Sequence, residues 1–164
     1  MVPQHVIEIA DSQDCLPIDA EVLEDIIRTV LVEEEVAGAE ISVAIVDNPT
    51  IHELNRQYLE HDYETDVLSF LLECDPEPTP DEEVPRGRGK RIEGEIIVSA
   101  EMAKQSAADF SWSPWEEFVL YVVHGLLHLA GYDDLSDSER EIMQSREQQM
   151  LSLCGMPQII RKIR

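Results

Sequence analysis

Two histidines four residues apart, His124 and His128, are the side chains in this sequence best suited to hold a metal ion. They lie in the stretch HGLLHLAGYDD, in which a glycine and two aspartates follow the second histidine. Side chains four apart on a helix project from the same face, so both imidazoles can bind one ion. A helix that ends at Gly131 lets the chain turn back with a third ligand, Asp134 or its neighbour Asp133. Three protein ligands with one open position are typical of catalytic zinc sites.

The alternative is a buried helix whose two histidines are hydrogen-bonded core residues. The run from Phe118 to Ala130 is apolar on nearly every side, which predicts a helix through the middle of the protein. Unpaired imidazoles would be costly there. The spacing H-x3-H-x5-acid also matches the ligand spacing of metzincin-like sites. We therefore favour the metal site.

The residue after the first histidine separates this stretch from the zinc proteases. Those enzymes carry a glutamate there as general base, whereas this chain has Gly125. A glycine inside a helix costs about 1 kcal/mol relative to alanine. Either something approaches the backbone closely at Gly125, or a side chain would obstruct the site. Phosphodiester hydrolysis remains open, because a metal can activate water and neutralise phosphate charge.

The surrounding sequence predicts the elements that must position this helix. Strands are expected in four stretches rich in β-branched and aliphatic residues, namely 2–10, 40–47, 66–72 and 95–98. Helices are expected where apolar residues recur at helical spacing or a capping residue precedes them: 18–37, from Asn48 to about Tyr58, 99–109, 113–130 and 136–154.

Capping residues mark the start of the two helices that flank the histidine stretch. Ser113 is the expected N-cap of the central helix, with Pro114 at its first position and Glu116 completing a capping box. Ser136 and Glu139 form a second capping box for the last helix.

The short helix in the middle of the chain is predicted in the same way. Asn48 is the expected N-cap and Pro49 the first helical residue. Ile51, Leu54 and Tyr58 then form the stripe that should be buried.

Length and composition predict a single domain over residues 1–164, because this length is sufficient for one core and no repeat is present. Residues 73–91 carry four prolines, two glycines and charges of both signs, which predicts a flexible charged surface loop. The N-terminal residues lack the basic start and apolar core of a signal peptide, and the three cysteines show no disulfide spacing. We therefore expect a cytoplasmic protein.

A net charge of -23 argues against a protein that binds nucleic acid regardless of its sequence, because phosphate binding relies on Lys and Arg. Seven of the 12 basic residues nevertheless fall in two short clusters: Arg86, Arg88, Lys90 and Arg91, and then Arg161, Lys162 and Arg164. These clusters either keep loops soluble or contact phosphate.

Three blocks of the sequence resemble one known family. HGLLHLAGYDD is similar to the signature H-G-x-L-H-L-x-G-Y-D-H of the YbeY family, metal-dependent endoribonucleases implicated in ribosomal RNA maturation and ribosome quality control. LNRQYLEHDYETDVLSF (54–70) and GEIIVSAEMAKQSA (94–107) resemble two further blocks of that family, in the same order. Together the blocks cover most of residues 40–152.

The resemblance implies an α+β fold in which helices pack on a mixed four-stranded sheet. It implies one zinc ion per chain, held zincin-like at the C-terminal end of the buried central helix by His124, His128 and Asp134. The implied activity is cleavage of single-stranded RNA, in which metal-bound water attacks the phosphodiester or the ion stabilises the pentacovalent transition state, and no residue can be named as general base. The implied partner is ribosomal RNA or the small ribosomal subunit. Because the acidic body of the protein should bind RNA poorly on its own, recruitment is expected to depend on the two basic clusters or on a ribosome-associated protein, and no membrane is expected as a partner.

The chain departs from the family pattern at two positions. Asp134 stands where the family has a third histidine, and an oxygen ligand makes manganese or iron possible beside zinc. Leu59 stands where many relatives have an arginine thought to contact RNA, and Arg56 on the same helix face is a candidate substitute. His61 and Asp62 lie on a loop that either faces the metal or is simply solvated. The candidate RNA-binding residues are Arg56, Arg86, Arg88, Lys90 and Arg91.

Other functions are compatible with the same residues. The main alternative is a non-catalytic ribosome-assembly or RNA-binding factor whose metal is structural. A non-haem iron enzyme would use two histidines and one carboxylate, but the spacing here differs from its usual short motif. A metalloprotease is disfavoured by Gly125.

Overall fold

A computed structural model describes residues 4–76, 87–157 and 159. Within these residues the elements follow in the order β1 (Gln4–Asp11), α1 (Ala20–Glu33), β2 (Gly38–Val46), α2 (Asn48–Leu59), β3 (Val67–Asp75), β4 (Arg91–Ser99), α3 (Ala100–Ala107), α4 (Pro114–Leu129) and α5 (Asp137–Leu153). Every strand and helix that the sequence predicts is present, with boundaries that differ by a few residues.

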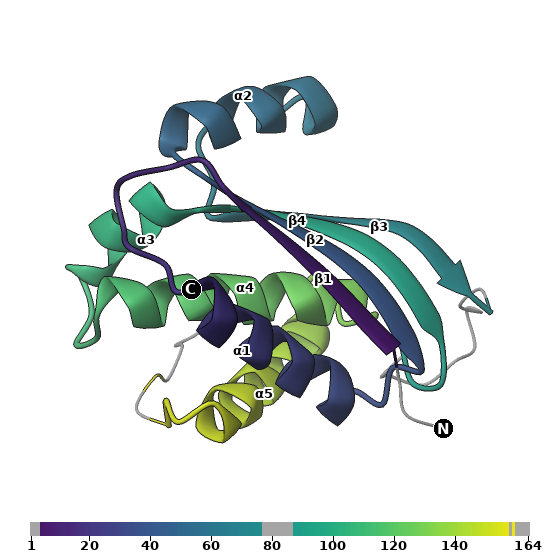
Figure 1. Ribbon diagram of the computed structural model, residues 1–164. Helices are drawn as coiled ribbons and strands as arrows, with labels where there is room; N and C mark the ends of the chain where they lie inside the picture. The colour runs from purple at the N-terminus through teal and green to yellow at the C-terminus, as the bar shows by residue number, and fades with distance from the viewer. Residues whose placement is uncertain (1–3, 77–86, 158, 160–164) are drawn as a thin grey trace.

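The strands form one mixed sheet in the order β1-β2-β4-β3. The pairs β1–β2 and β2–β4 are parallel, and β3 runs antiparallel to β4 at the edge. Side chains of β2 alternate between two faces: Ile41, Val43 and Ile45 join the main core, whereas Val46 joins a smaller cluster with Ile51 of α2. Helices α1, α4 and α5 therefore lie on one face of the sheet and α2 on the other (Figure 1). This confirms the predicted α+β fold with a mixed four-stranded sheet.

Helix α4 runs through the centre of the molecule, between the sheet and α5 (Figure 1). Of the residues from Phe118 to Ala130, all but the two histidines are buried. The predicted central helix is thus confirmed. Among the described helices, none combines the length and apolar character that crossing a bilayer requires.

Two glycines allow α4 to approach the sheet closely. A Cβ atom on Gly125 would lie 3.2 Å from Cγ2 of Val67 and 3.4 Å from Cγ2 of Ile96. A Cβ atom on Gly94 of β4 would lie 2.7 Å from Cδ1 of Leu129. The sequence offered two reasons for Gly125, and the structure shows the first of them. Side chains of β3 and β4 approach the backbone of α4 closely at this residue.

The predicted caps of the two flanking helices are present. The Ser113 hydroxyl accepts from the N–H of Glu116, whose carboxylate accepts from the N–H of Ser113. Ser136 accepts from the N–H of Glu139 at the start of α5. Gly131 has φ of 100°, a left-handed conformation that turns the chain away from the end of α4.

The start and the buried face of α2 differ from the prediction. The N-cap is Asp47, whose carboxylate accepts from the N–H of Thr50 at 3.0 Å. Asn48 is the first helical residue instead, because its side chain accepts from the Ser99 hydroxyl at 2.7 Å. Tyr58 was predicted to be buried but is 65% exposed, because it lies near the end of α2, where its ring packs at an angle against Phe70.

The segment 73–91, predicted to be a flexible loop, belongs to strands at both of its ends. Antiparallel pairing continues as far as Asp75 opposite Arg91, so residues 73–75 and residue 91 belong to strands. Lys90 is buried, and its carbonyl accepts from the N–H groups of Ala37 and Gly38. Residues 77–86 lie outside the described part of the chain.

Candidate metal centre

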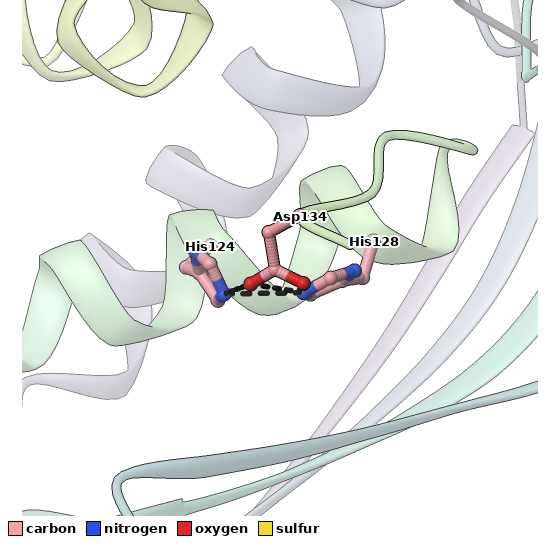
Figure 2. Close-up of side chains that lie close together, drawn as sticks. All are labelled: His124, His128 and Asp134. Atoms are coloured by element: carbon pink, nitrogen blue, oxygen red, sulfur yellow. Dashed lines mark hydrogen bonds and ion pairs between the residues drawn. The ribbon is translucent and has the colours of Figure 1, made fainter. Parts of the chain in front are cut away.

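Three side chains converge at the C-terminal end of α4 (Figure 2). His124 and His128 project from the helix, and Asp134 comes from the chain that follows Gly131. The two Nε2 atoms are 3.1 Å apart, and Oδ2 of Asp134 is 3.7 Å from each of them. Two ligands at the usual zinc distances of about 2.0–2.1 Å are roughly 3.4 Å apart at a tetrahedral angle. The three atoms therefore have the separations of ligands around one ion.

Asp134, rather than Asp133, faces the two histidines. The carboxylate of Asp133 accepts a hydrogen bond from the N–H of Asp134 at 2.8 Å and so serves the turn itself. The backbone carbonyl of Asp134 accepts from the Arg140 guanidinium at 3.4 Å. Of the two aspartates that the sequence left open, the structure brings the carboxylate of Asp134 to 3.7 Å from both Nε2 atoms.

Hydrogen bonds on the far side of each imidazole determine which nitrogen carries the proton. Nδ1 of His128 is 3.1 Å from the carbonyl oxygen of Tyr132. A carbonyl can only accept, so Nδ1 carries the proton and Nε2 presents a lone pair. Nδ1 of His124 bonds in the same way to the carboxylate of Glu147. Two lone pairs and a carboxylate oxygen then point at one another, a donor set that fits a divalent cation.

The surroundings of His128 favour its neutral form. Burial lowers the pKa of His128, and the neighbouring His124 lowers it further, although Asp134 and Asp133 oppose these effects. Metal ligation requires the neutral form. The side chain of His128 is 26% exposed, and its lowered pKa leaves the imidazole neutral at neutral pH. His128 can therefore bind a metal without first losing a proton.

The cluster is open to solvent on one side. The side chains of His124 and Asp134 are 17% and 40% exposed. A closed structural zinc site has four protein ligands, whereas a catalytic site keeps a position for water or substrate. Among the described residues the group that could hold an ion has three members, which is the catalytic pattern.

Sequence reasoning missed Glu147. It lies on α5, it is 1% exposed, and its carboxylate holds the first histidine. One signal was present in the sequence, because Glu147 lies on the buried face of α5 with Met143, Met150 and Leu151. A glutamate on the apolar stripe of an amphipathic helix indicates a buried partner.

A second missed group anchors the turn that carries Asp134. The Tyr132 hydroxyl donates to the buried carboxylate of Glu34 at 3.4 Å, and the Arg146 guanidinium donates to the same oxygen at 2.6 Å. Burial and the nearby Glu34 raise the pKa of Tyr132 to about 12, so it remains a hydroxyl donor. The Tyr132 side chain is thereby held by Glu34, at the end of α1, and by Arg146 of α5. The backbone carbonyl of the same tyrosine orients His128.

Two of the candidate RNA-binding arginines, Arg56 and Arg88, form ion pairs with glutamates. Arg56 lies on α2, across the sheet from α4, and pairs with Glu53 at 2.6 Å. Arg88 is exposed and pairs with Glu35 at 2.5 Å.

The other basic candidates are buried, surrounded by carboxylates or outside the described residues. Lys90 is buried. Arg91 lines a pocket with four carboxylates, those of Glu40, Glu73, Asp75 and Glu93. Outside the described residues lie Arg86 and the second basic cluster, Arg161, Lys162 and Arg164.

His61 and Asp62 have partners of their own. Asp62 pairs with His52 at 2.8 Å, and the His61 ring stacks on Tyr63 and bonds to its hydroxyl. All four side chains lie on the α2 side of the molecule or in the loop after it. The structure therefore favours the solvated loop over a loop that faces the metal.

Comparison with known proteins is consistent with this geometry. A protein family described as Endoribonuclease YbeY matches residues 8–155 of the chain. An Endoribonuclease YbeY from Salinibacter ruber is 38% identical over 135 residues, 82% of this chain and 83% of the relative. Another from Bacillus licheniformis is 36% identical over 154 residues, 92% of this chain and 96% of the relative.

A solved structure is similar as well. The solution structure of TM1509 from Thermotoga maritima has a TM-score of 0.55 and 26% sequence identity, and the match covers 90% of this chain and 91% of that one. The matched family region runs from within β1 past the end of α5 and includes the whole stretch from His124 to Asp134. The resemblance seen in the three sequence blocks is confirmed, and the chain belongs to the YbeY family of endoribonucleases.

Proposed function

We propose that residues 1–164 form one catalytic domain, a metal-dependent endoribonuclease that cuts single-stranded ribosomal RNA during maturation and ribosome quality control. Membership of a family described as Endoribonuclease YbeY supports the reaction class. The observation that carries the proposal is the convergence of two imidazole lone pairs and the Asp134 carboxylate at a solvent-accessible position.

A divalent ion bound to these three residues supplies a Lewis acid, which makes water a better nucleophile at neutral pH and offsets charge on a phosphodiester. His124 and His128 bind through Nε2, and Asp134 binds through a carboxylate oxygen. Gly125 faces the sheet, so the position at which zinc proteases carry their base supplies no side chain here. This arrangement favours phosphodiester over peptide hydrolysis.

Zinc is the ion we propose, at one per chain, with manganese or iron as alternatives. Two imidazoles suit zinc, whereas the oxygen of Asp134 shifts the preference toward harder ions. The same oxygen brings a negative charge that a third histidine would not, which should make water at the site less acidic.

We propose that the body of the protein contributes little to the affinity for RNA. With a net charge of -23, repulsion of phosphate opposes tight binding by the chain alone. Arg56 and Arg88 are the exposed cations we propose as phosphate contacts. We further propose that a ribosome-associated protein in the cytoplasm recruits the enzyme to the small subunit.

RNA cleavage by three protein samples tests the proposed activity. Metal-free protein, zinc- or manganese-loaded protein and loaded His128→Ala protein are incubated with a single-stranded RNA and with its duplex. We expect cleavage of the single strand by the loaded wild type alone. The acidic surface favours a second candidate, a ribosome-assembly factor with a structural metal. Bound metal without cleavage, on RNA or on isolated small subunits, would support that candidate instead.

A further inference from the structure

Glu147 is a buried carboxylate that meets the metal centre from another helix. It is 1% exposed and lies on α5, 23 residues along the chain from His124, whose Nδ1 it contacts. Met143, Met150 and Leu151 of the same helix are buried in the main core. The backbone position of Glu147 is therefore fixed by the packing of α5 on α4.

The two histidines are oriented by different acceptors. His128 donates to a neutral acceptor, the backbone carbonyl of Tyr132 in the adjacent turn. His124 contacts a side-chain acceptor instead, the carboxylate of Glu147 on α5. A carboxylate behind an imidazole holds the ring in one orientation and tautomer and makes its other nitrogen a stronger donor to a metal.

We infer that Glu147 is a positioning residue that holds His124 with its Nε2 lone pair directed at the ion and raises the affinity of the centre for a divalent metal. This inference rests on the proposed function, because it assigns Glu147 a role toward the same three ligands. It also adds a second carboxylate to that of Asp134. Two carboxylates balance the charge of one divalent ion.

Two variants of Glu147 separate this role from a purely structural one. Glu147→Leu removes the charge and the acceptor for Nδ1 together; because removal of one partner of a buried pair is destabilising, folding of this variant is checked first. Glu147→Gln keeps an acceptor for Nδ1 but removes the charge. Glu117→Gln is the control, since Glu117 is also fully buried but bonds to the Trp112 indole instead of a ligand.

The experiment measures the zinc dissociation constant of each protein by competition with a chromogenic chelator. Nitrogen-15 NMR of the His124 ring reports the tautomer of the metal-free protein. We expect Glu147→Leu to weaken zinc binding about 10- to 100-fold and to lose the single Nδ1–H tautomer. The Gln variant should keep the tautomer and weaken binding severalfold, and the control should match the wild type.

Wild-type zinc affinity and tautomer in a folded Glu147→Leu protein would overturn the inference. If that variant does not fold, unchanged affinity in Glu147→Gln would overturn it equally. A His128→Ala protein distinguishes this failure from failure of the proposed function. Loss of zinc in His128→Ala with full affinity in the Glu147 variants rejects only the positioning role, whereas no zinc binding by the wild type rejects both.

Discussion

Asp134 is the residue at which this metal centre differs from the pattern of its family. Its oxygen lies 3.7 Å from both imidazole nitrogens, where the proposed centre needs a third ligand. An aspartate ligand is an anion, whereas a histidine ligand at the same position would be neutral. The chemical nature of this one side chain therefore bears on which ion the centre prefers.

Asp134→His should shift that preference toward zinc. A third imidazole replaces the hard oxygen ligand, so we expect the ratio of zinc to manganese affinity to rise at least about tenfold. Competitive titration of metal-free protein with each ion measures the ratio. Asp134→Asn, which keeps the shape but removes the charge, should weaken both ions. An unchanged ratio in Asp134→His would mean that residue 134 does not contact the ion.

His5 gives the metal-free fold a pH dependence. Burial lowers the pKa of His5 below its ordinary value of 6.5, and the nearby Arg28 lowers it further, although the bond to the Val36 carbonyl opposes this. The folded protein therefore binds this proton less tightly than the unfolded chain. Its contribution to stability is complete above pH 6.5 and falls as the pH drops from there toward the lowered pKa.

Urea unfolding of metal-free wild type and His5→Gln at about pH 7 and about pH 5 measures this effect. The wild type should lose more unfolding free energy between the two pH values than the variant does. Other titrating groups, His128 included, are present in both proteins and cancel in the comparison. Equal losses would show that His5 keeps an ordinary pKa in the fold.

At the scale of elements, the position of the metal centre depends on how closely α4 packs on the sheet. Gly125 permits this packing, because its missing side chain leaves room for Val67 of β3 and Ile96 of β4. The same glycine lies next to His124. Close packing of α4 on the sheet and the proposed metal binding therefore depend on neighbouring residues of one helix.

The Gly125→Glu protein should unfold more easily than the wild type and should not gain protease activity. The glutamate would be driven against Val67 and Ile96, so overpacking and the burial of charge should lower the unfolding free energy by more than about 2 kcal/mol. Gly125→Ala is the control. Its methyl group must displace side chains by a few tenths of an ångström, while the helix gains up to about 1 kcal/mol.

Urea unfolding of the wild type and the two Gly125 variants compares these energies. If the Gly125→Glu protein were as stable as the wild type, α4 would not pack on the sheet through this position.

The elements that the sequence predicted well are those fixed by local residues. Helix α4 was predictable because Ser113 and Glu116 mark its start and Gly131 its end. The two histidines followed from helical spacing alone. Tyr58 was misplaced because its exposure depends on where α2 runs past the sheet.

The supporting residues of the centre were not predictable in the same way. Glu147 meets His124 across 23 residues, and Tyr132 meets Glu34 across 98. Such pairs depend on how α1, α4 and α5 pack together. Local sequence patterns indicate that a buried carboxylate needs a partner but do not identify which one.

For the whole molecule, charge limits how RNA is bound. With 35 acidic and 12 basic residues, few cations are available to meet phosphate. If Arg88 contacts RNA, the phosphate competes with the Glu35 carboxylate for its guanidinium group. Each phosphate contact to a single strand contributes about 0.7 to the slope of log affinity against log salt.

Arg88→Ala should therefore reduce that slope by about 0.7 and weaken RNA binding at low salt. Lys104→Ala is the control, because Lys104 is an exposed cation on α3 outside the candidate set. Fluorescence anisotropy with a labelled single strand from about 50 to about 200 mM salt measures both slopes. The same slope in the wild type and Arg88→Ala would remove Arg88 from the RNA interface.

The central claim is that His124, His128 and Asp134 hold one divalent ion. Elemental analysis of the purified, untagged protein beside its Asp134→Ala variant tests it most directly. We predict about one zinc, manganese or iron per wild-type chain, and a strongly reduced content in the variant. No metal in the wild type after dialysis against these ions, or equal content in both proteins, would contradict the three-residue metal centre.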